Sequence, residues 1–220
     1  MWERPDPDSL AAGRTALVVF DMLEMYRTEI ERSGVIPAAM RLLQICRDAD
    51  VIVCFARADH RPDGADYTRV VTDADRNFQP WTRARPQPVR PDQELGGLAY
   101  QVLAELGPRP SDFDVPKHRW SAFHGTALDT ILRAQNIESV LVIGGSTHVG
   151  VASTVYAGRD LDYQMIVVRD ACTGNSDQRE YFLNSVFPRV CRVRTVDDVR
   201  SMLMAGHAKK QRSRRRARSA

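Results

Sequence analysis

The sequence predicts an α/β protein, a three-layer α/β/α sandwich around a mainly parallel six-stranded sheet. Strand-like apolar runs alternate with helical patterns along nearly the whole chain. Several runs are apolar at almost every residue, as in TALVVFD at 15–21 and VIVCFAR at 51–57. Such runs are typical of strands that a parallel sheet buries on both faces. The composition, 43% hydrophobic and 27% charged, is ordinary for a globular domain.

The expected elements follow one another in a regular order. Strands are predicted at 15–21, 51–57, 112–117, 139–145, 164–170 and near 190–194. Apolar residues at helical spacing predict helices at 35–50, 93–106, 126–135, 148–161, 177–186 and from about 196. Thr126 and Asp129 have the spacing of a capping box at the start of the 126–135 helix. The long irregular stretch 58–92 is rich in proline in its second half, and a lid, an oligomer contact or a mere insertion would each explain it.

The chain divides into one domain, residues 1–206, and a basic tail, residues 207–220. The net charge is +3, but the tail holds seven basic residues and no acid, so the domain is mildly acidic. A basic segment without apolar residues is expected to be disordered. It could bind polyanions weakly and with strong salt dependence, or it could be a solvated tail without a partner.

Several classes of protein are excluded or disfavoured. No apolar run approaches 18 residues, which excludes a transmembrane helix, and the first residues lack the hydrophobic region of a secretory signal. The four cysteines form no CxxC pair and have no zinc-like spacing with histidine, so reduced, buried thiols are expected. We therefore expect a cytoplasmic protein without a membrane partner.

Polar residues gather where the predicted strands end. Asp21 ends the first strand, Arg57 the second and Lys117 the third, and the fourth runs into the glycine-flanked segment 144–150. In parallel α/β sheets, ligands bind beyond the carboxyl ends of the strands. An acid, a lysine and a helix start on neighbouring strand ends could therefore converge on one pocket.

These segments resemble the isochorismatase-like hydrolase superfamily, which includes cysteine amidohydrolases and isochorismatases. The resemblance runs through about residues 14–204 and is carried by three segments: LVVFDM, PKHRWSAFHGTALDTIL and VLVIGGSTHVGVASTVYAGRDLDYQMIVVRDA. It implies that Asp21 is the catalytic acid or base and Lys117 the catalytic lysine.

The resemblance also exposes a departure at the third catalytic position. The amidohydrolases carry Thr-x-x-Cys, whereas this chain reads Thr147-His148-Val149-Gly150, and glycine has no side chain to act as a nucleophile. Isochorismatases resemble this segment with His-x-Gly and cleave an enol ether without a nucleophile. In them an aspartate protonates the enolpyruvyl carbon and water captures the resulting cation. Ser146, Thr147 and Cys172 remain possible substitute nucleophiles.

Further binding residues are expected around these positions. Arg57, Trp120 and Phe123 are candidates for the pocket wall, since an arginine suits a carboxylate. Ser146, Thr147 and His148 are expected at the substrate, and backbone N–H groups near Ser146 and Gly150 would form an anion-binding site at the helix start. The resemblance implies a cis peptide bond between Gly145 and Ser146. Nicotinamidase-like relatives bind metal near Asp59 and His60 with a different spacing, so we expect no metal, and no cofactor.

Three functions stay open. The first is a nucleophile-free hydrolase of a small carboxylated substrate, in its sharpest form an isochorismate-type enol-ether hydrolase that releases pyruvate. The second is a member of the amidohydrolase branch, like N-carbamoylsarcosine amidase, with a degenerate nucleophile. The third is a pseudoenzyme that binds a ligand without turnover. The resemblance further implies a homodimer or homotetramer.

Overall fold

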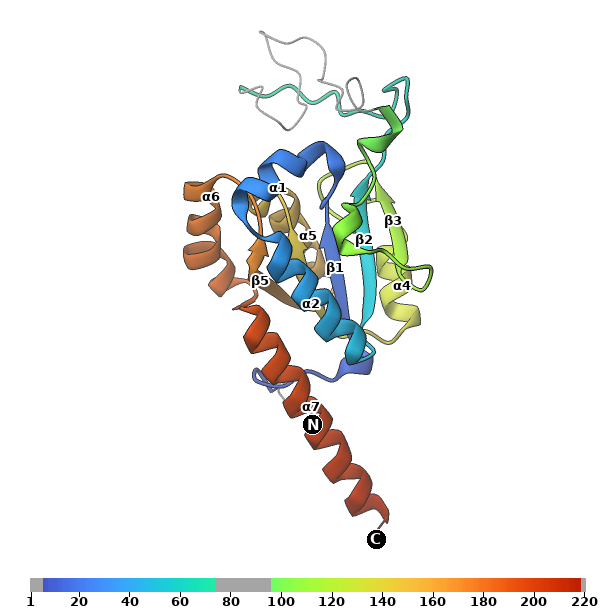
Figure 1. Ribbon diagram of the computed structural model, residues 1–220, viewed down its shortest axis with the longest axis vertical. Helices are drawn as coiled ribbons and strands as arrows, with labels where there is room; N and C mark the ends of the chain where they lie inside the picture. Colours follow the sequence, from blue (N-terminus) through green and yellow to red (C-terminus); the bar gives the residue numbers. More distant parts are fainter. Residues whose placement is uncertain (1–5, 74–95, 219–220) are drawn as a thin grey trace.

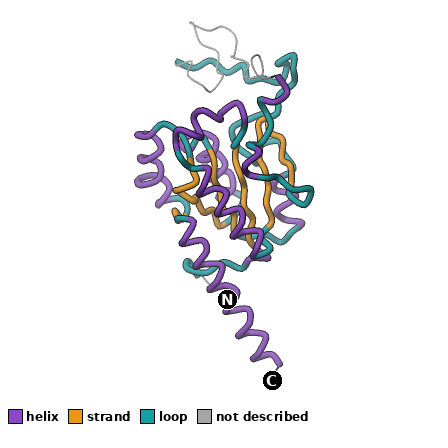
Figure 2. Tube along the Cα trace, viewed as in Figure 1, coloured by secondary structure: helices purple, strands orange, loops and turns teal. Residues whose placement is uncertain are grey.

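The protein folds around a six-stranded parallel sheet, as the sequence predicts (Figures 1 and 2). The structure, a computed structural model, describes residues 6–73 and 96–218. The strands lie in the order β3-β2-β1-β4-β5-β6, and every neighbouring pair is parallel. Their bounds are β1 Thr15–Phe20, β2 Ile52–Ala58, β3 Phe113–Lys117, β4 Ser139–Gly144, β5 Gln164–Cys172 and β6 Arg192–Arg194. The strand order reverses direction between β1 and β4, which creates a crevice at their carboxyl ends.

Helices cover both faces of this sheet and complete the three layers (Figure 1). The described helices are α1 Arg27–Ser33, α2 Ile36–Asp48, α4 Leu128–Ala134, α5 Ala152–Asp160, α6 Ser176–Tyr181 and α7 Val196–Arg218. Strand β1 is buried at every residue, and its side chains alternate between the two layers. Leu17 and Val19 pack with α2 and α7, whereas Val18 and Phe20 pack with α4 and α5. This alternation places Phe20 on the α5 side, beside the end of β1.

The predicted helix at 93–106 is wrong for the residues that the structure describes. Two short 3-10 turns, Gly96–Leu98 and Ala104–Leu106, replace it. The backbone between them pairs with the segment after β1: Leu103 N donates to Met22 O and Glu24 N donates to Gln101 O, both over 2.9 Å. These tertiary hydrogen bonds take the place of the ladder that a helix would need. The rest of the predicted loop at 58–92, from residue 74 onward, lies outside the described residues.

The start of α4 also differs in detail from its prediction. Thr126 Oγ1 accepts a hydrogen bond from Leu128 N over 3.2 Å. Asp129 does not close the capping box, because its carboxylate accepts a hydrogen bond from the Tyr163 hydroxyl instead, over 2.8 Å.

The basic segment that the sequence predicts to be disordered is helical up to Arg218, as the end of α7. Thr195 and Asp198 begin this helix with a reciprocal capping box. Val199 and Met202 then bury its first turns against the sheet, and the following Ala, Lys, Gln and Arg residues have high helix propensity. The end of the helix projects away from the body (Figure 1).

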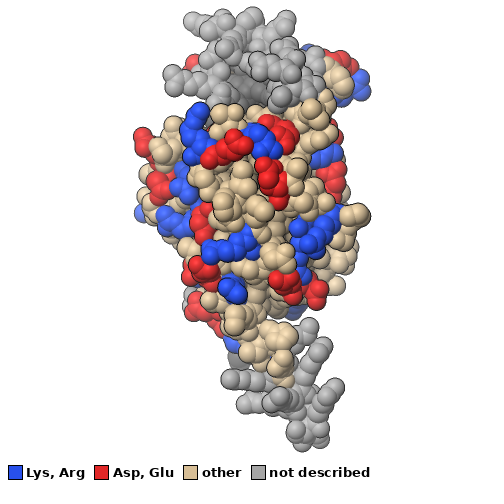
Figure 3. Space-filling view, viewed as in Figure 1, with Lys and Arg blue, Asp and Glu red and all other residues tan. Residues whose placement is uncertain are grey.

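Charged side chains of both signs are interspersed over the face of the body that Figure 3 shows. None of the described helices combines the length and apolarity needed to cross a bilayer. The four cysteines are free thiols, of which Cys46, Cys54 and Cys172 are buried and Cys191 is partly buried, in agreement with the expectation.

Candidate active site

A cavity of about 1240 Å³ opens at the carboxyl end of the sheet, where the strand order reverses. Asp21 after β1, Lys117 at the end of β3 and Gly150 after β4 all line it. The structure therefore brings together the three residues that the sequence predicts at the chemical centre of the site.

The backbone after β1 turns Asp21 toward the end of β2. Asp21 has a positive φ of 47°, a left-handed conformation that aspartate tolerates better than most residues. Its N–H continues the ladder by donating to Ala56 O over 2.9 Å. Its Oδ1 then accepts the N–H of Ala58 over 2.7 Å. The carboxylate is thus fixed by the backbone of the neighbouring strand.

Lys117 reaches the same carboxylate from the other side of β2. It is the last residue of β3 and pairs in register with Ala58. Its Nζ donates to Asp21 Oδ2 over 2.6 Å. Both side chains are almost fully buried, with 8% of Asp21 and 4% of Lys117 exposed. A buried ion pair of this kind requires its hydrogen bonds to offset the loss of solvation.

Two opposing effects act on the acidity of Asp21. Burial raises its pKa because it disfavours the charged carboxylate. The positive charge and hydrogen bond of Lys117, and the hydrogen bond from Ala58, lower it. Burial is the larger effect, so the pKa of Asp21 lies above its ordinary value. A raised pKa suits a group that must hold a proton for transfer.

The space beside Gly150 is filled by the ring of Phe20. A Cβ atom on Gly150 would lie 2.2 Å from Phe20 Cε1 and 2.5 Å from Cζ, far inside van der Waals contact. Phe20 is 1% exposed and belongs to the packed core under α5. Its ring also lies under the Lys117 ammonium, with Nζ 4.3 Å from the ring centroid. An aromatic ring therefore occupies the space that a side chain at position 150 would need.

The turn after β4 contains the expected cis peptide bond between Gly145 and Ser146. In the helix start that follows, Thr147 N donates to Thr173 O, and both Val149 N and Val151 N donate to Ser146 O. These three amides are satisfied within the protein.

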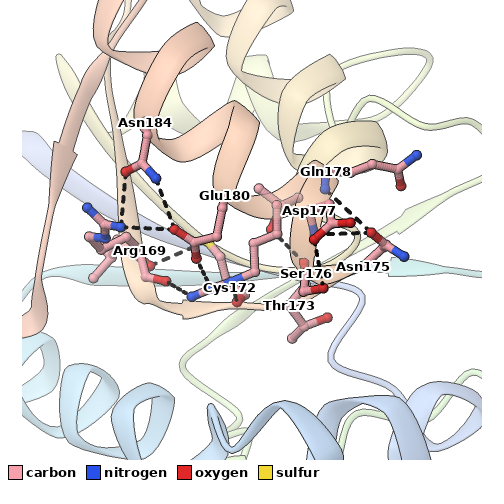
Figure 4. Close-up of polar contacts among 12 residues, drawn as sticks. Arg169, Cys172, Thr173, Asn175, Ser176, Asp177, Gln178, Glu180 and Asn184 are labelled. Atoms are coloured by element: carbon pink, nitrogen blue, oxygen red, sulfur yellow. Dashed lines mark hydrogen bonds and ion pairs between the residues drawn. The ribbon is translucent and has the colours of Figure 1, made fainter.

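Ser146, His148 and Trp120 line the cavity, as predicted. Burial lowers the pKa of His148, which favours its neutral form. One wall of the cavity consists of Thr173 and Asn175, which follow β5, and of Ser176 and Gln178 at the start of α6, all labelled in Figure 4. Asn175 Oδ1 accepts the N–H groups of Asp177 and Gln178, over 3.2 and 3.4 Å, and so holds this wall in place (Figure 4).

The structure does not bring three of the predicted binding residues to the cavity. Arg57 forms a two-pronged ion pair with Asp114, with distances of 2.7 and 2.8 Å, and contacts Asp59 over 3.2 Å. Phe123 stacks on Tyr163, with ring centroids 5.7 Å apart. Thr147 is fully buried and donates its hydroxyl to Thr173 O. Each of these side chains is engaged in holding the fold.

The possible substitute nucleophiles are weak in this structure. Cys172 is fully buried and its Sγ lies 3.3 Å from Val168 O. Burial raises the pKa of its thiol to about 12, which suppresses the reactive thiolate. The Thr147 hydroxyl donates to Thr173 O, so among these three candidates Ser146 is the one that lines the cavity.

Sequence reasoning missed Phe20, the Ala58 N–H and a group formed by His60, Asp66 and His118. Phe20 belongs to an apolar run, which predicts an ordinary core residue. The Ala58 N–H is a backbone group, and backbone groups have no sequence signature. The sequence pairs His60 with Asp59 as candidate metal ligands, whereas in the structure Asp66 Oδ2 lies 3.4 Å from His60 Nδ1. The segment DHRPDGAD could have indicated this contact, because it contains acids on both sides of His60 in a loop short enough to bring a later one back to the ring.

Comparisons with known proteins agree with this architecture. The family model of the isochorismatase domain matches residues 15–198. The isochorismatase family protein YecD of Escherichia coli is 31% identical over 88% of this chain and 98% of its own length. The ureidoacrylate amidohydrolase RutB of Pseudomonas savastanoi is 30% identical over 76% of this chain and 74% of its own. A solved isochorismatase family protein from Burkholderia thailandensis superposes with a TM-score of 0.76 at 27% identity, covering 90% of this chain and 98% of its own. Because the isochorismatase model covers residues 15–198 and YecD is 31% identical over 88% of the chain, the chain belongs to the isochorismatase family.

Proposed function

We propose that the protein hydrolyses a small carboxylated substrate by acid–base chemistry of Asp21 and Lys117, without a covalent intermediate. The observation that carries this proposal is the packing of Phe20 against Gly150, which leaves no room for a nucleophilic side chain beside the buried ion pair. The reaction that fits such a site best is cleavage of an isochorismate-type enol ether.

The proposed steps need one proton donor and one water molecule. Asp21 protonates the methylene carbon of the enolpyruvyl group, and the ether carbon becomes an oxocarbenium ion. Water adds to that carbon and returns a proton to Asp21. The hemiketal that results then breaks its C–O bond and releases pyruvate and the alcohol. Asp21 ends as it began, so the atoms and protons balance.

Lys117 has two roles in this proposal. Its ammonium group holds Asp21 in one orientation through the 2.6 Å hydrogen bond. Its positive charge also favours binding of a carboxylate substrate. Lys117 lines the cavity and is hardly exposed to solvent, so water screens this attraction less than it would at the surface. The ring of Phe20 closes the side of the ammonium away from solvent.

A second candidate function is C–N bond hydrolysis by direct attack of water. The similarity to ureidoacrylate amidohydrolase RutB favours it, since that relative aligns over three quarters of this chain. In this case Asp21 acts as the base that activates water, and its raised pKa strengthens it as a base.

The test is to follow pyruvate release from isochorismate and, in parallel, ammonia release from ureidoacrylate. Wild-type protein is compared with Asp21→Asn and with Arg57→Gln, a matched variant outside the cavity. Pyruvate release that Asp21→Asn abolishes and Arg57→Gln retains supports the first function. Ammonia release with the same pattern supports the second. Ligand binding without either product overturns both in favour of a pseudoenzyme.

A further inference from the structure

A group of two histidines and one aspartate lies beside the cavity, and the chemistry proposed above does not use it. His60 follows β2, and His118 comes directly after Lys117 at the end of β3. Both histidines line the cavity. Asp66 comes from the loop that continues beyond His60, and it stands between the two rings.

The donor atoms of this group have the spacing of a metal site. Asp66 Oδ2 lies 3.4 Å from His60 Nδ1 and 3.2 Å from His118 Nδ1. One ligand atom from each of the three residues falls within 4.8 Å of the other two. Bonds of about 2.0–2.2 Å from zinc to nitrogen and oxygen place neighbouring tetrahedral ligands roughly 3.3–3.5 Å apart. The two measured distances agree with that geometry.

A second observation comes from the hydrogen bonding of His60. Its Nδ1 is buried, and no group in the described part of the chain forms a hydrogen bond with it. The Asp66 Oδ2 atom lies 3.4 Å from it, at the outer limit of a hydrogen bond. Buried polar atoms normally have a partner. A cation placed among the three residues would supply one.

The surrounding contacts hold the three side chains in this arrangement. Arg61 N donates to Asp66 Oδ1 over 3.2 Å, and Arg119 Nη1 donates to the Asp66 carbonyl over 2.9 Å. The His60 ring packs edge-on against Tyr67, with centroids 4.4 Å apart. Partners of this kind orient metal ligands in proteins. The nearby guanidinium of Arg61 pairs with Asp63, so its charge is partly balanced.

The geometry points to a site for a divalent transition-metal ion of the zinc or manganese class, held by His60, Asp66 and His118. Two imidazole nitrogens and one carboxylate oxygen suit such an ion, and three protein ligands leave a position for water or substrate. The inference goes beyond the proposed function, which assigns no role to these residues. It also revises the expectation of no metal, which considered Asp59 rather than Asp66.

The test uses the full chain, stripped of metal by a chelator, and titrated with Co²⁺ and then with Zn²⁺. We expect one equivalent of Co²⁺ to produce visible absorption bands, Zn²⁺ to displace them, and Zn²⁺ to raise the melting temperature. His118→Ala should weaken Co²⁺ binding about tenfold or more, since loss of even an indirect partner has that effect. His118 is half exposed, so this variant should fold normally.

His124→Ala is the matched control, because His124 lines the same cavity but does not belong to the group. It should bind Co²⁺ as the wild type does. Asp66→Asn should weaken binding as His118→Ala does. The inference is overturned if the wild type binds no stoichiometric Co²⁺, or if His118→Ala binds it as tightly as the wild type.

Discussion

The floor of the cavity and its rim differ in how they are built. The floor consists of Phe20, Asp21, Lys117 and Gly150, which come from the ends of strands or the first turn after one. These residues are buried, with Asp21 the most exposed at 8%. The rim includes Val70, His118, Arg119 and Trp120, which come from loops, and 51% of Trp120 and 63% of Val70 are exposed. The floor is therefore part of the hydrophobic core, whereas the rim is part of the surface.

This difference has a consequence for how each region responds to change. A substitution in the floor alters packing, charge balance and chemistry together, since the same side chains serve all three. A substitution in the rim should alter ligand binding and leave the stability of the fold nearly unchanged. The following predictions test this contrast, and the largest expected effect comes first.

Lys117→Met should have the largest effect, because it removes the cation from a buried pair. We expect the turnover of the substrate identified above to fall by about 1000-fold. The free energy of unfolding should fall by about 3–5 kcal/mol, the usual cost of breaking a buried pair. Urea denaturation and steady-state kinetics measure the two effects. Arg119→Met, which removes an exposed cation that lines the cavity, should cost less than about 1 kcal/mol. Equal losses in the two variants would contradict the distinction between floor and rim.

Gly150→Cys tests the packing of the floor directly. The new side chain would overlap the Phe20 ring, and overpacking of this kind costs about 1–3 kcal/mol. Phe20→Val provides the missing space but leaves a cavity on its own. The double variant should therefore be more stable than the sum of the two single effects predicts, by about 0.5–3 kcal/mol.

A double-mutant cycle in urea gives this coupling energy. Alkylation by iodoacetamide then reports whether the introduced thiol is reactive beside Lys117. Strict additivity of the two substitutions would show that the Phe20 ring does not occupy the position of a side chain at residue 150.

Trp120→Ala tests the rim. Trp120 lines the cavity while half of its surface is exposed. We expect the KM for the substrate to rise several-fold with little change in kcat, and the free energy of unfolding to change by less than about 1 kcal/mol. Initial-rate kinetics and a urea titration measure these quantities. A large loss of stability would place Trp120 with the core.

The smallest expected effect concerns His148, which lines the cavity and is half-buried. Burial lowers its pKa, so below its ordinary value of about 6.5 the unfolded chain takes up a proton that the folded chain resists. This residue therefore makes the fold less stable as the pH falls from 7.5 to 5.5. His148→Gln should reduce the difference between the urea midpoints at these two pH values. An unchanged difference would show that His148 titrates alike in both states.

The sequence predicted the residues of the floor better than those of the rim, because strands have a clearer sequence pattern than loops. Strand positions follow from continuous apolar runs, so the meeting of Asp21 and Lys117 at one edge of the sheet could be anticipated. The contact between Phe20 and Gly150 depends on the register of β1 and β4, which pairs Phe20 with Gly144. No local pattern encodes that register. Phe20 therefore read as an ordinary core residue.

The expectations that the structure corrects concern residues whose contacts come from other parts of the chain. Arg57 forms its ion pair with Asp114, which belongs to the adjacent strand β3. The group of His60, Asp66 and His118 joins two loops that follow different strands, and loop conformation is not visible in periodicity. The segment 93–106 carried a helical pattern, yet its backbone pairs with the residues after β1. In this segment, tertiary hydrogen bonds outweighed helix propensity; in the other two cases, contacts between separate segments determined the side-chain partners.

The two outer strands bear on how copies of this protein can associate. β3 carries Pro116, which has no N–H to offer a further strand, and β6 is three residues long. Neither edge is a good template for another chain to extend the sheet. Assembly into larger particles would therefore proceed through helices and loops, and partly unfolded molecules would have little native edge on which fibrils could grow.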